Sequence, residues 1–184
     1  MSLWLGTRPG DWQGDALKIE TTADVDELVS YLGRVFERTR RVAVLIPAGE
    51  LEHDFGRDGF TPGDLVRHLA GIDRYMFVEA VACGKNRYPG HDRSLADGLE
   101  SVLGYYDRLV GECLQILRGM PPTDFTAKVK TPDGASITAW KWLRAMVEHE
   151  AHHRGQLYWM LAQFGVQTPP LYGLTSEQVR TRAE

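Results

Sequence analysis

The sequence predicts an all-α protein, an antiparallel four-helix bundle with a small hairpin or extended excursion before the last long helix. Apolar residues recur at spacings of three and four along several long segments, and Pro and Gly cluster between those segments. Alternating apolar and polar residues occur in one stretch that is too short to found a sheet. Because long helices with short connections pack as antiparallel neighbours, residues 1–184 are expected to form a single helical-bundle domain.

The first two helices are predicted over residues 22–46 and 62–84. Acidic residues lie near the start of the first helix and arginines near its end, which suits the helix dipole at both ends. In the second helix, Thr61 can act as the N-cap and Pro62 occupies the first helical position. Gly84 is the predicted end of this helix.

The third helix is predicted over residues 94–118, where a continuous apolar face is followed by Gly119 and two prolines. Residues 123–138 alternate around a Pro-Asp-Gly turn signal, which indicates the small hairpin or extended excursion. The fourth helix is predicted to start near Thr138 and to end at Gly165.

Composition restricts the function before any motif is considered. Of the 184 residues, 25% are charged and 43% are hydrophobic, and the formal net charge is -4, values typical of a soluble globular protein. The mild acidity gives no electrostatic reason to expect a nucleic-acid partner. The N-terminus lacks the features of a signal peptide, and no apolar run is long enough for a membrane helix. We therefore expect a cytoplasmic protein, with Cys83 and Cys113 as reduced thiols.

Two histidines on the fourth helix form a candidate metal site. They lie in "MVEHEAHHRGQLYWML", residues 146–161. At about 100° per residue, His149 and His153 fall within the stripe of Trp142, Met146, Leu157, Met160 and Phe164, whereas His152 projects toward the wetter side. Two imidazoles one turn apart that both face the bundle interior can give two ligands to one metal ion.

A third ligand can come from the second predicted helix. His68 stands at the margin of that helix's apolar stripe, so it can also face the core. If the second and fourth helices are neighbours, His68, His149 and His153 supply three neutral nitrogen ligands and leave a position open, as in catalytic sites. His53 and His91 lie in loop-like sequence and are expected to be ordinary surface residues.

The string "HEAHH" also matches the H-E-x-x-H pattern of zinc peptidases, in which the glutamate, here Glu150, is the general base. The longer form of that motif needs Gly and His where this chain has Gln156 and Trp159. Glu177 is a conceivable third ligand, but no long helix precedes it and no strand upstream would align a peptide. The context therefore disfavours a protease.

The strings "LVRHLAGID" and "HEAHHRGQLYWMLAQFGV", set among four long helices, resemble the DinB/YfiT-like family of metal-dependent enzymes. The resemblance implies a four-helix bundle, often dimeric, in which three histidines bind a divalent metal ion. One lies on the second helix and matches His68. The other two precede an Arg-Gly-Gln on the last long helix and match His149 and His153, followed by residues 154–156.

The resemblance also implies an activity. Members of the family include bacillithiol and mycothiol S-transferases and a mycothiol-dependent maleylpyruvate isomerase, so the resemblance predicts a small-molecule substrate, a low-molecular-weight thiol, and a homodimer. Zn²⁺ or Ni²⁺ is the expected ion, with Mn²⁺ as the alternative. A hydrolase that uses the same ion to activate water, and a non-enzymatic stress-related metal-binding protein, are the other two hypotheses.

Four further residues lie near the predicted ligands, and their roles follow from their positions on the helices. Glu150 lies at the edge of the apolar face and can act as a base or form a structural ion pair with an arginine, which we favour. Gln156 can hydrogen-bond a ligand or a substrate, while Arg154 is expected to fix helix contacts. Asp64, one turn before His68, can orient the imidazole or cap the helix.

Overall fold

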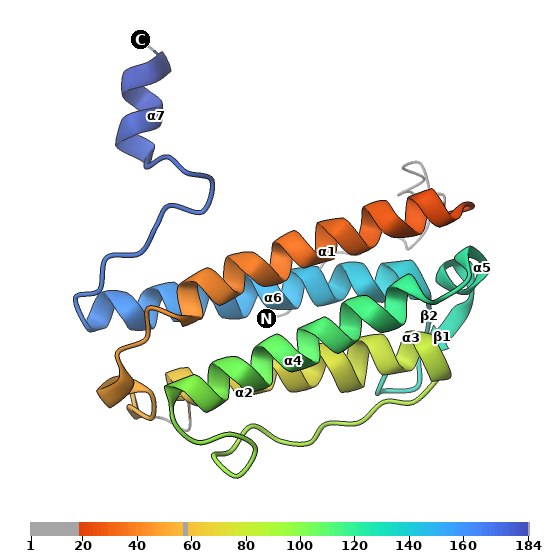
Figure 1. Ribbon diagram of the computed structural model, residues 1–184, viewed down its shortest axis with the longest axis horizontal. Coiled ribbons are helices and arrows are strands. Elements are labelled where there is room, and N and C mark those ends of the chain that lie inside the picture. Colours follow the sequence, from red (N-terminus) through yellow and green to blue (C-terminus); the bar gives the residue numbers. More distant parts are fainter. Residues whose placement is uncertain (1–18, 57–58, 184) are drawn as a thin grey trace, which may run out of the picture.

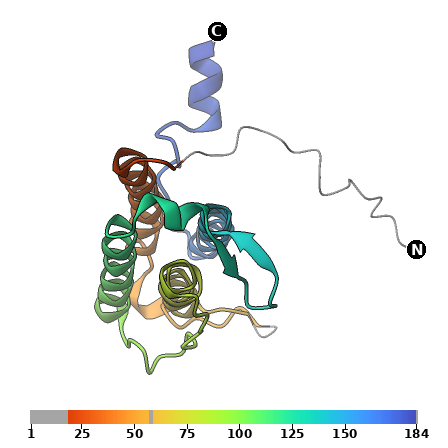
Figure 2. The same ribbon diagram turned by 90° about the vertical axis from the view of Figure 1, so that its right-hand side faces the viewer.

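The computed structural model of the protein describes residues 19–56 and 59–183. Four long rods form a bundle: α1 (Thr22–Ala43), α2 (Pro62–Ile72) with its continuations, α4 (Leu99–Arg118) and α6 (Ala139–Gln163). Seen end-on, the four surround one apolar core (Figure 2). The predicted all-α four-helix bundle is therefore confirmed. None of the helices in these ranges is both long and apolar enough to cross a membrane.

The second rod is continuous but changes its winding. After α2, a π-helical stretch η2 (Asp73–Val78) leads into α3 (Glu79–Cys83), and Gly84 ends the rod with a positive φ of 71°. As predicted, Thr61 caps its start and Pro62 is its first residue. The chain then returns along the bundle through residues 84–98, the return segment, so that α2 and α4 run in the same direction (Figure 1). This long connection was not anticipated from the sequence.

Two helix ends differ from the sequence prediction. The first helix ends at Ala43 instead of residue 46, because the chain turns there and leads into a short 3-10 helix, η1 (Ala48–Glu50). The third begins at Leu99 instead of residue 94. Gly98, which precedes it, has a φ of 82°, a conformation outside the right-handed helical region.

The predicted hairpin is confirmed as a small element near the start of α6. A short helix α5 (Pro122–Thr126) precedes the antiparallel strands β1 (Lys128–Lys130) and β2 (Ser136–Thr138), with Val129 paired to Ile137. A last helix, α7 (Ser176–Ala183), projects away from the bundle (Figure 1). Both cysteines are free, as expected from the sequence: Cys83 is exposed and Cys113 is buried.

Inside the apolar core lies a group of buried polar side chains that we call the core polar cluster. Each of the four rods contributes to it: Thr39 from α1, Asp73 from η2, Tyr106 from α4, and Glu150 and Arg154 from α6. The Glu150 carboxylate accepts hydrogen bonds from the hydroxyl of Thr39 and, at 3.0 Å, from that of Tyr106. Arg154 donates to the Thr39 hydroxyl at 3.2 Å. These bonds fix how α6 is turned within the bundle.

The two carboxyl groups of the core polar cluster hold protons more tightly than usual. Burial raises the pKa of Asp73 well above its ordinary value, and the negative charge of Glu150 raises it further. Burial also raises the pKa of Glu150, while the hydrogen bonds from the hydroxyls of Thr39 and Tyr106 act in the opposite direction. A proton retained on Asp73 keeps these two neighbouring carboxyl groups from both being charged in the core, and Arg154 balances the negative charge of Glu150.

The substitution Asp73→Asn is expected to stabilise the protein above pH 7. A folded-state pKa that is raised means that the folded chain holds a proton which the unfolded chain releases above about pH 4. Wild-type stability therefore falls as the pH rises from there through the folded-state pKa. The Asn amide is neutral without taking up a proton, so the variant should lose this slope and gain about 1–3 kcal/mol at pH 8.

Urea unfolding of chelator-treated protein between pH 7 and pH 9 measures this effect. The wild type and the variant contain the same histidines, so histidine titration cancels in the comparison of their slopes. Asp26→Asn, at an exposed carboxylate of α1, is the matched control and should leave the slope unchanged. An Asp73→Asn variant with the wild-type slope would show that Asp73 is ionised in the folded protein.

Candidate metal centre

Three histidine side chains meet between α2 and α6, as the sequence predicted. One ring nitrogen each of His68, His149 and His153 lies within 4.8 Å of the other two. The Nε2 atoms of His68 and His149 are 3.1 Å apart. His153 is buried, with 8% of its surface exposed, whereas the other two are half-buried. We call this group the three-histidine site.

The donor set fits one divalent ion of the first transition row or zinc. Imidazole nitrogens suit Zn²⁺, Ni²⁺ and related ions. Two nitrogens that each lie about 2.0–2.1 Å from one tetrahedral Zn²⁺ are roughly 3.3–3.4 Å apart, close to the His68–His149 separation. Among the residues that the structure describes, no carboxylate or thiol joins this group within ligand distance. Three protein ligands would leave at least one position for a substrate or solvent molecule.

The outer nitrogens of two of these rings are held by hydrogen bonds. His68 Nδ1 lies 2.8 Å from the Tyr88 hydroxyl, and His153 Nδ1 lies 2.6 Å from Gln156 Oε1. A ring that donates through Nδ1 keeps the lone pair of Nε2 free for a metal ion. His149 Nδ1 is buried without a hydrogen-bond partner. His68 and His153 are therefore fixed by polar partners, and His149 is fixed by packing alone.

The three imidazoles are neutral at physiological pH. Burial lowers the pKa of His68 to about 3 and that of His149 to about 4, and the nearby histidines lower both further. Burial also lowers the pKa of His153, although its hydrogen bond to Gln156 acts in the opposite direction. Neutral imidazole is the form that binds a metal ion, so the fold prepares the ligands for coordination.

Aromatic rings form an apolar wall around the site. The ring of Phe60 lies 4.8 Å from that of His68 and 5.7 Å from that of His153, and Phe77 lies 5.7 Å from His149. Such a wall lowers the local dielectric constant and limits access of water, which strengthens the interaction of an ion with its ligands.

The structure decides between the interpretations of the residues beside the ligands. Glu150 is fully buried in the core polar cluster, where the hydroxyls of Thr39 and Tyr106 bond to it instead of the arginine that we expected. It has a structural role there, and its carboxylate does not join the three-histidine group as a peptidase base would. Arg154 bonds to α1, as expected for a helix contact. Gln156 does hydrogen-bond a predicted ligand. Asp64 caps α2 through Thr61 and bonds to Arg67, so it does not orient His68.

One prediction about the histidines was wrong. His91, expected to be an ordinary surface residue, lies against the site: its Nδ1 is 2.5 Å from the Tyr88 hydroxyl and its ring packs on Phe60. The contact depends on the path of the return segment, which local sequence does not reveal. Pro89 and Gly90, a turn signal between Tyr88 and His91, were the available hint. His53 does remain half-exposed, and its Nδ1 lies 2.9 Å from the Glu50 carboxylate.

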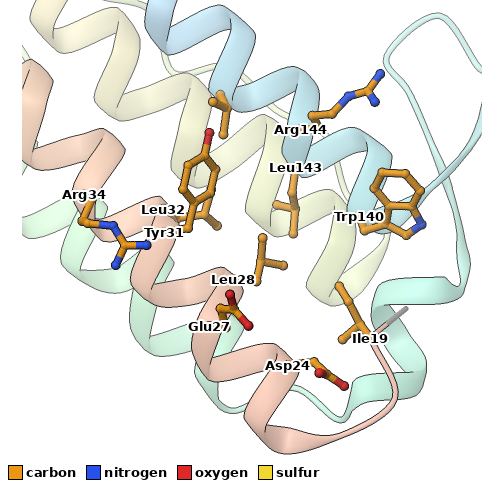
Figure 3. Close-up of a pocket in the computed structure, with 11 residues that line it drawn as sticks. Ile19, Asp24, Glu27, Leu28, Tyr31, Leu32, Arg34, Trp140, Leu143 and Arg144 are labelled. Atoms are coloured by element: carbon orange, nitrogen blue, oxygen red, sulfur yellow. The ribbon is translucent and has the colours of Figure 1, made fainter. Parts of the chain in front are cut away.

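A separate apolar groove of about 460 Å³ runs between the first halves of α1 and α6 (Figure 3). We call it the α1 groove. Leu28, Leu143 and Trp140 line its floor, and Tyr31 stands beside them with 41% of its surface exposed. None of the three histidines borders it, so it is a different surface from the candidate metal centre.

The chain is similar in sequence to one protein family and in structure to several solved proteins. A family model described as the DinB superfamily matches residues 31–157. YjoA, a DinB-like protein of Bacillus subtilis, has a similar structure, with a TM-score of 0.64 and 16% sequence identity over 81% of this chain and 99% of that chain. No curated protein matches the sequence.

Two further solved structures have the same fold. YfiT of Bacillus subtilis, described as a probable metal-dependent hydrolase with an unusual four-helix bundle topology, matches with a TM-score of 0.61 and 18% identity over 80% of this chain and 91% of that chain. A variant of the mycothiol-dependent maleylpyruvate isomerase matches with a TM-score of 0.58 and 14% identity over 74% of this chain and 62% of that chain. At such identities the likeness concerns the fold.

Zinc affinity is expected to change by less than about twofold between pH 8 and pH 6, because the lowered pKa values leave no proton for the ion to displace. For three imidazoles with the ordinary pKa of about 6.5, the zinc affinity would fall roughly 50- to 100-fold between pH 8 and pH 6. Competition with a chelator of known pH dependence measures the difference. His152 is exposed and directly precedes His153, so His152→Ala is the control and should show the wild-type pH dependence of zinc affinity. A loss of tenfold or more would contradict neutral, buried ligands.

Proposed function

Because the chain belongs to the DinB superfamily, we propose that it is a metal-dependent enzyme in which His68, His149 and His153 hold one divalent ion, Zn²⁺ or Ni²⁺ in preference to Mn²⁺. The observation that carries the proposal is the convergence of three neutral imidazole nitrogens from two helices. Two of the rings have their outer nitrogens held by hydrogen bonds, an arrangement typical of metal ligands. An open coordination position would make the ion catalytic instead of structural.

We propose further that the reaction is the transfer of a low-molecular-weight thiol to a small electrophile. When bound, the ion would lower the pKa of the thiol and hold the thiolate. The chain's own residues supply the neutral ligands and the apolar wall of Phe60 and Phe77, which limits competing water. In transfer to an alkyl halide, a sulfur–carbon bond forms, the carbon–halogen bond breaks with its electron pair leaving on the halide, and the thiol proton passes to solvent.

One feature favours the thiol over water as the nucleophile. Water activation in hydrolytic metal sites is commonly assisted by a carboxylate base, as in the H-E-x-x-H peptidases. Here the adjacent glutamate, Glu150, is committed to the core polar cluster. A thiol is more acidic than water and needs less assistance. The second candidate, a metal-dependent hydrolase, is favoured by the fold similarity to YfiT. A non-enzymatic metal-binding protein would call for a fourth protein ligand, which the group of three lacks within the described ranges.

A conjugation screen tests the proposed reaction. Metal-stripped protein is reloaded with Zn²⁺, Ni²⁺ or Mn²⁺ and incubated with bacillithiol, mycothiol, glutathione or coenzyme A and a chromogenic electrophile. We expect metal-dependent turnover with at least one thiol, reduced by at least about 100-fold in His153→Ala through loss of a ligand. His152→Ala, one residue away and exposed, should retain it. Metal-dependent ester hydrolysis without any thiol turnover would favour the hydrolase instead.

We propose that the protein pairs with a second copy of itself through the α1 groove. Along α1, the groove is bordered by Asp24 and Glu27 toward the helix start and by Arg34 toward its end, with exposed Tyr31 between them. An antiparallel partner related by a two-fold axis near Tyr31 would set Glu27 opposite Arg34 of the partner subunit, twice per dimer. The apolar floor would supply the buried area, about 800 Å² per subunit in stable complexes.

Charge exchange tests this pairing. Arg34→Glu should raise the dimer dissociation constant by at least about tenfold, because two like-charge contacts replace two attractive ones. Adding Glu27→Arg to the same chain should restore pairing. Light scattering over a dilution series measures both. Arg41→Glu, at an exposed position of α1 outside the groove, is the control. A monomeric wild-type protein, or a double variant no better than Arg34→Glu, would refute the α1 groove as the interface.

A further inference from the structure

The return segment brings two polar side chains against the outer edge of His68. The Tyr88 hydroxyl lies 2.8 Å from His68 Nδ1 and 2.5 Å from His91 Nδ1, so it joins the two imidazoles. Nδ1 and Nε2 lie on different edges of the imidazole ring, and His68 Nε2 faces His149. Tyr88 is therefore placed behind the predicted ligand and not at the position of the ion.

If the lone pair of His68 Nε2 is free for an ion, the donors and acceptors in the chain from His68 through Tyr88 to His91 are fixed. His68 Nδ1 then carries the proton and donates to the Tyr88 oxygen. The Tyr88 hydroxyl in turn donates to His91 Nδ1, which accepts. Each member thus fixes the next: His91 orients the hydroxyl of Tyr88, and Tyr88 orients the ring and tautomer of His68.

The return segment is anchored firmly enough for this task. Arg67, fully buried beside His68 on α2, donates to the carbonyl of Ala96 at 2.9 Å and to that of His91 at 3.1 Å. It also pairs with Glu52 and, at 2.8 Å, with Asp64. The backbone that carries His91 is therefore tied to the helix that carries His68.

A second anchor acts one turn further along α2. Gly71 lets the return segment approach the helix, because a Cβ atom at that position would lie 3.3 Å from the ring of Pro89 and 3.8 Å from the carbonyl oxygen of Gly90. The amide of Arg87 also donates to the carbonyl of Tyr75 at 3.1 Å. Residues on both sides of Tyr88 are thus fixed to the second rod, which holds the hydroxyl in place.

We propose that Tyr88, oriented by His91, is a positioning residue that fixes His68 for coordination and thereby sets the metal affinity of the three-histidine site. The inference rests on the proposed metal-binding function. Both residues belong to the return segment and lie at the outer edge of His68. The proposed role also explains why Tyr88, although 44% exposed, has its hydroxyl enclosed between two ring nitrogens.

The test compares zinc dissociation constants, measured by competition with a chelator. Tyr88→Phe keeps the ring and removes the oxygen, so the constant should rise by about 10- to 100-fold, the usual effect of losing a partner of a metal-ligating histidine. The stoichiometry at saturating zinc should stay at one ion per chain. The control, Tyr172→Phe, alters a tyrosine that is 83% exposed and should have no effect.

Variants at His91 test the second link without altering Tyr88. His91→Leu removes the acceptor and should weaken zinc binding by a smaller factor, roughly three- to tenfold. His91→Gln restores an acceptor oxygen and should bind within about twofold of wild type. In the Co²⁺-substituted protein, the ligand-field spectrum should shift in Tyr88→Phe and remain unchanged in Tyr172→Phe, which separates a reoriented ligand from a general loss of stability.

Three outcomes are distinguishable. Wild-type zinc affinity in Tyr88→Phe and His91→Leu, together with lost binding in His68→Ala, would overturn this inference and leave the proposed function intact. A wild-type protein that binds no zinc, nickel or manganese would refute the proposed function and this inference with it. Weakened binding in Tyr88→Phe, with rescue in His91→Gln relative to His91→Leu, would support the assignment.

Discussion

The site depends on the rotation of α6 about its own axis. Neighbouring residues on a helix project about 100° apart. The site histidines of α6 therefore face α2, while its buried polar side chains face α1 and α4. Glu150 and Arg154, each next to a ligand histidine, are tied to Thr39 and Tyr106 inside the core. Turning α6 by one residue would leave a carboxylate among apolar side chains without a partner, which costs several kcal/mol. The hydrogen bonds of Glu150 and Arg154 therefore also fix the direction in which His149 and His153 point.

Burial shifts the pKa values of the two polar groups in this stretch of the bundle in opposite directions, and both shifts keep the groups near zero charge. In the three-histidine site, burial among aromatic rings disfavours protonated imidazole and so lowers the pKa of the histidines. The core polar cluster contains two carboxyl groups and one guanidinium, so a retained proton on Asp73 keeps its net charge near zero. A compact bundle can therefore accommodate both groups with little net charge inside it.

Much of this arrangement could be predicted from the sequence, because it follows from periodicity. The four helices, the caps at Thr61 and Gly84, and the inward pair His149 and His153 are all local patterns on a helix. His68 needed in addition that α2 and α6 be neighbours. The contact between Tyr88 and His91 could not be predicted in this way. It depends on the path of residues 84–98, which Arg67 and Gly71 determine through tertiary contacts that leave no periodic signal.

The long return segment has a consequence for how such a protein can diversify. Residues 84–98 lie outside the helices, yet they supply the groups behind His68 and pass beside Phe60. The ligands themselves belong to helices whose packing tolerates little change. Under the proposed function, substitutions in the segment would change the affinity for the ion while the four helices stay as they are. The three histidines and the groups that orient His68 therefore lie on separate pieces of the chain.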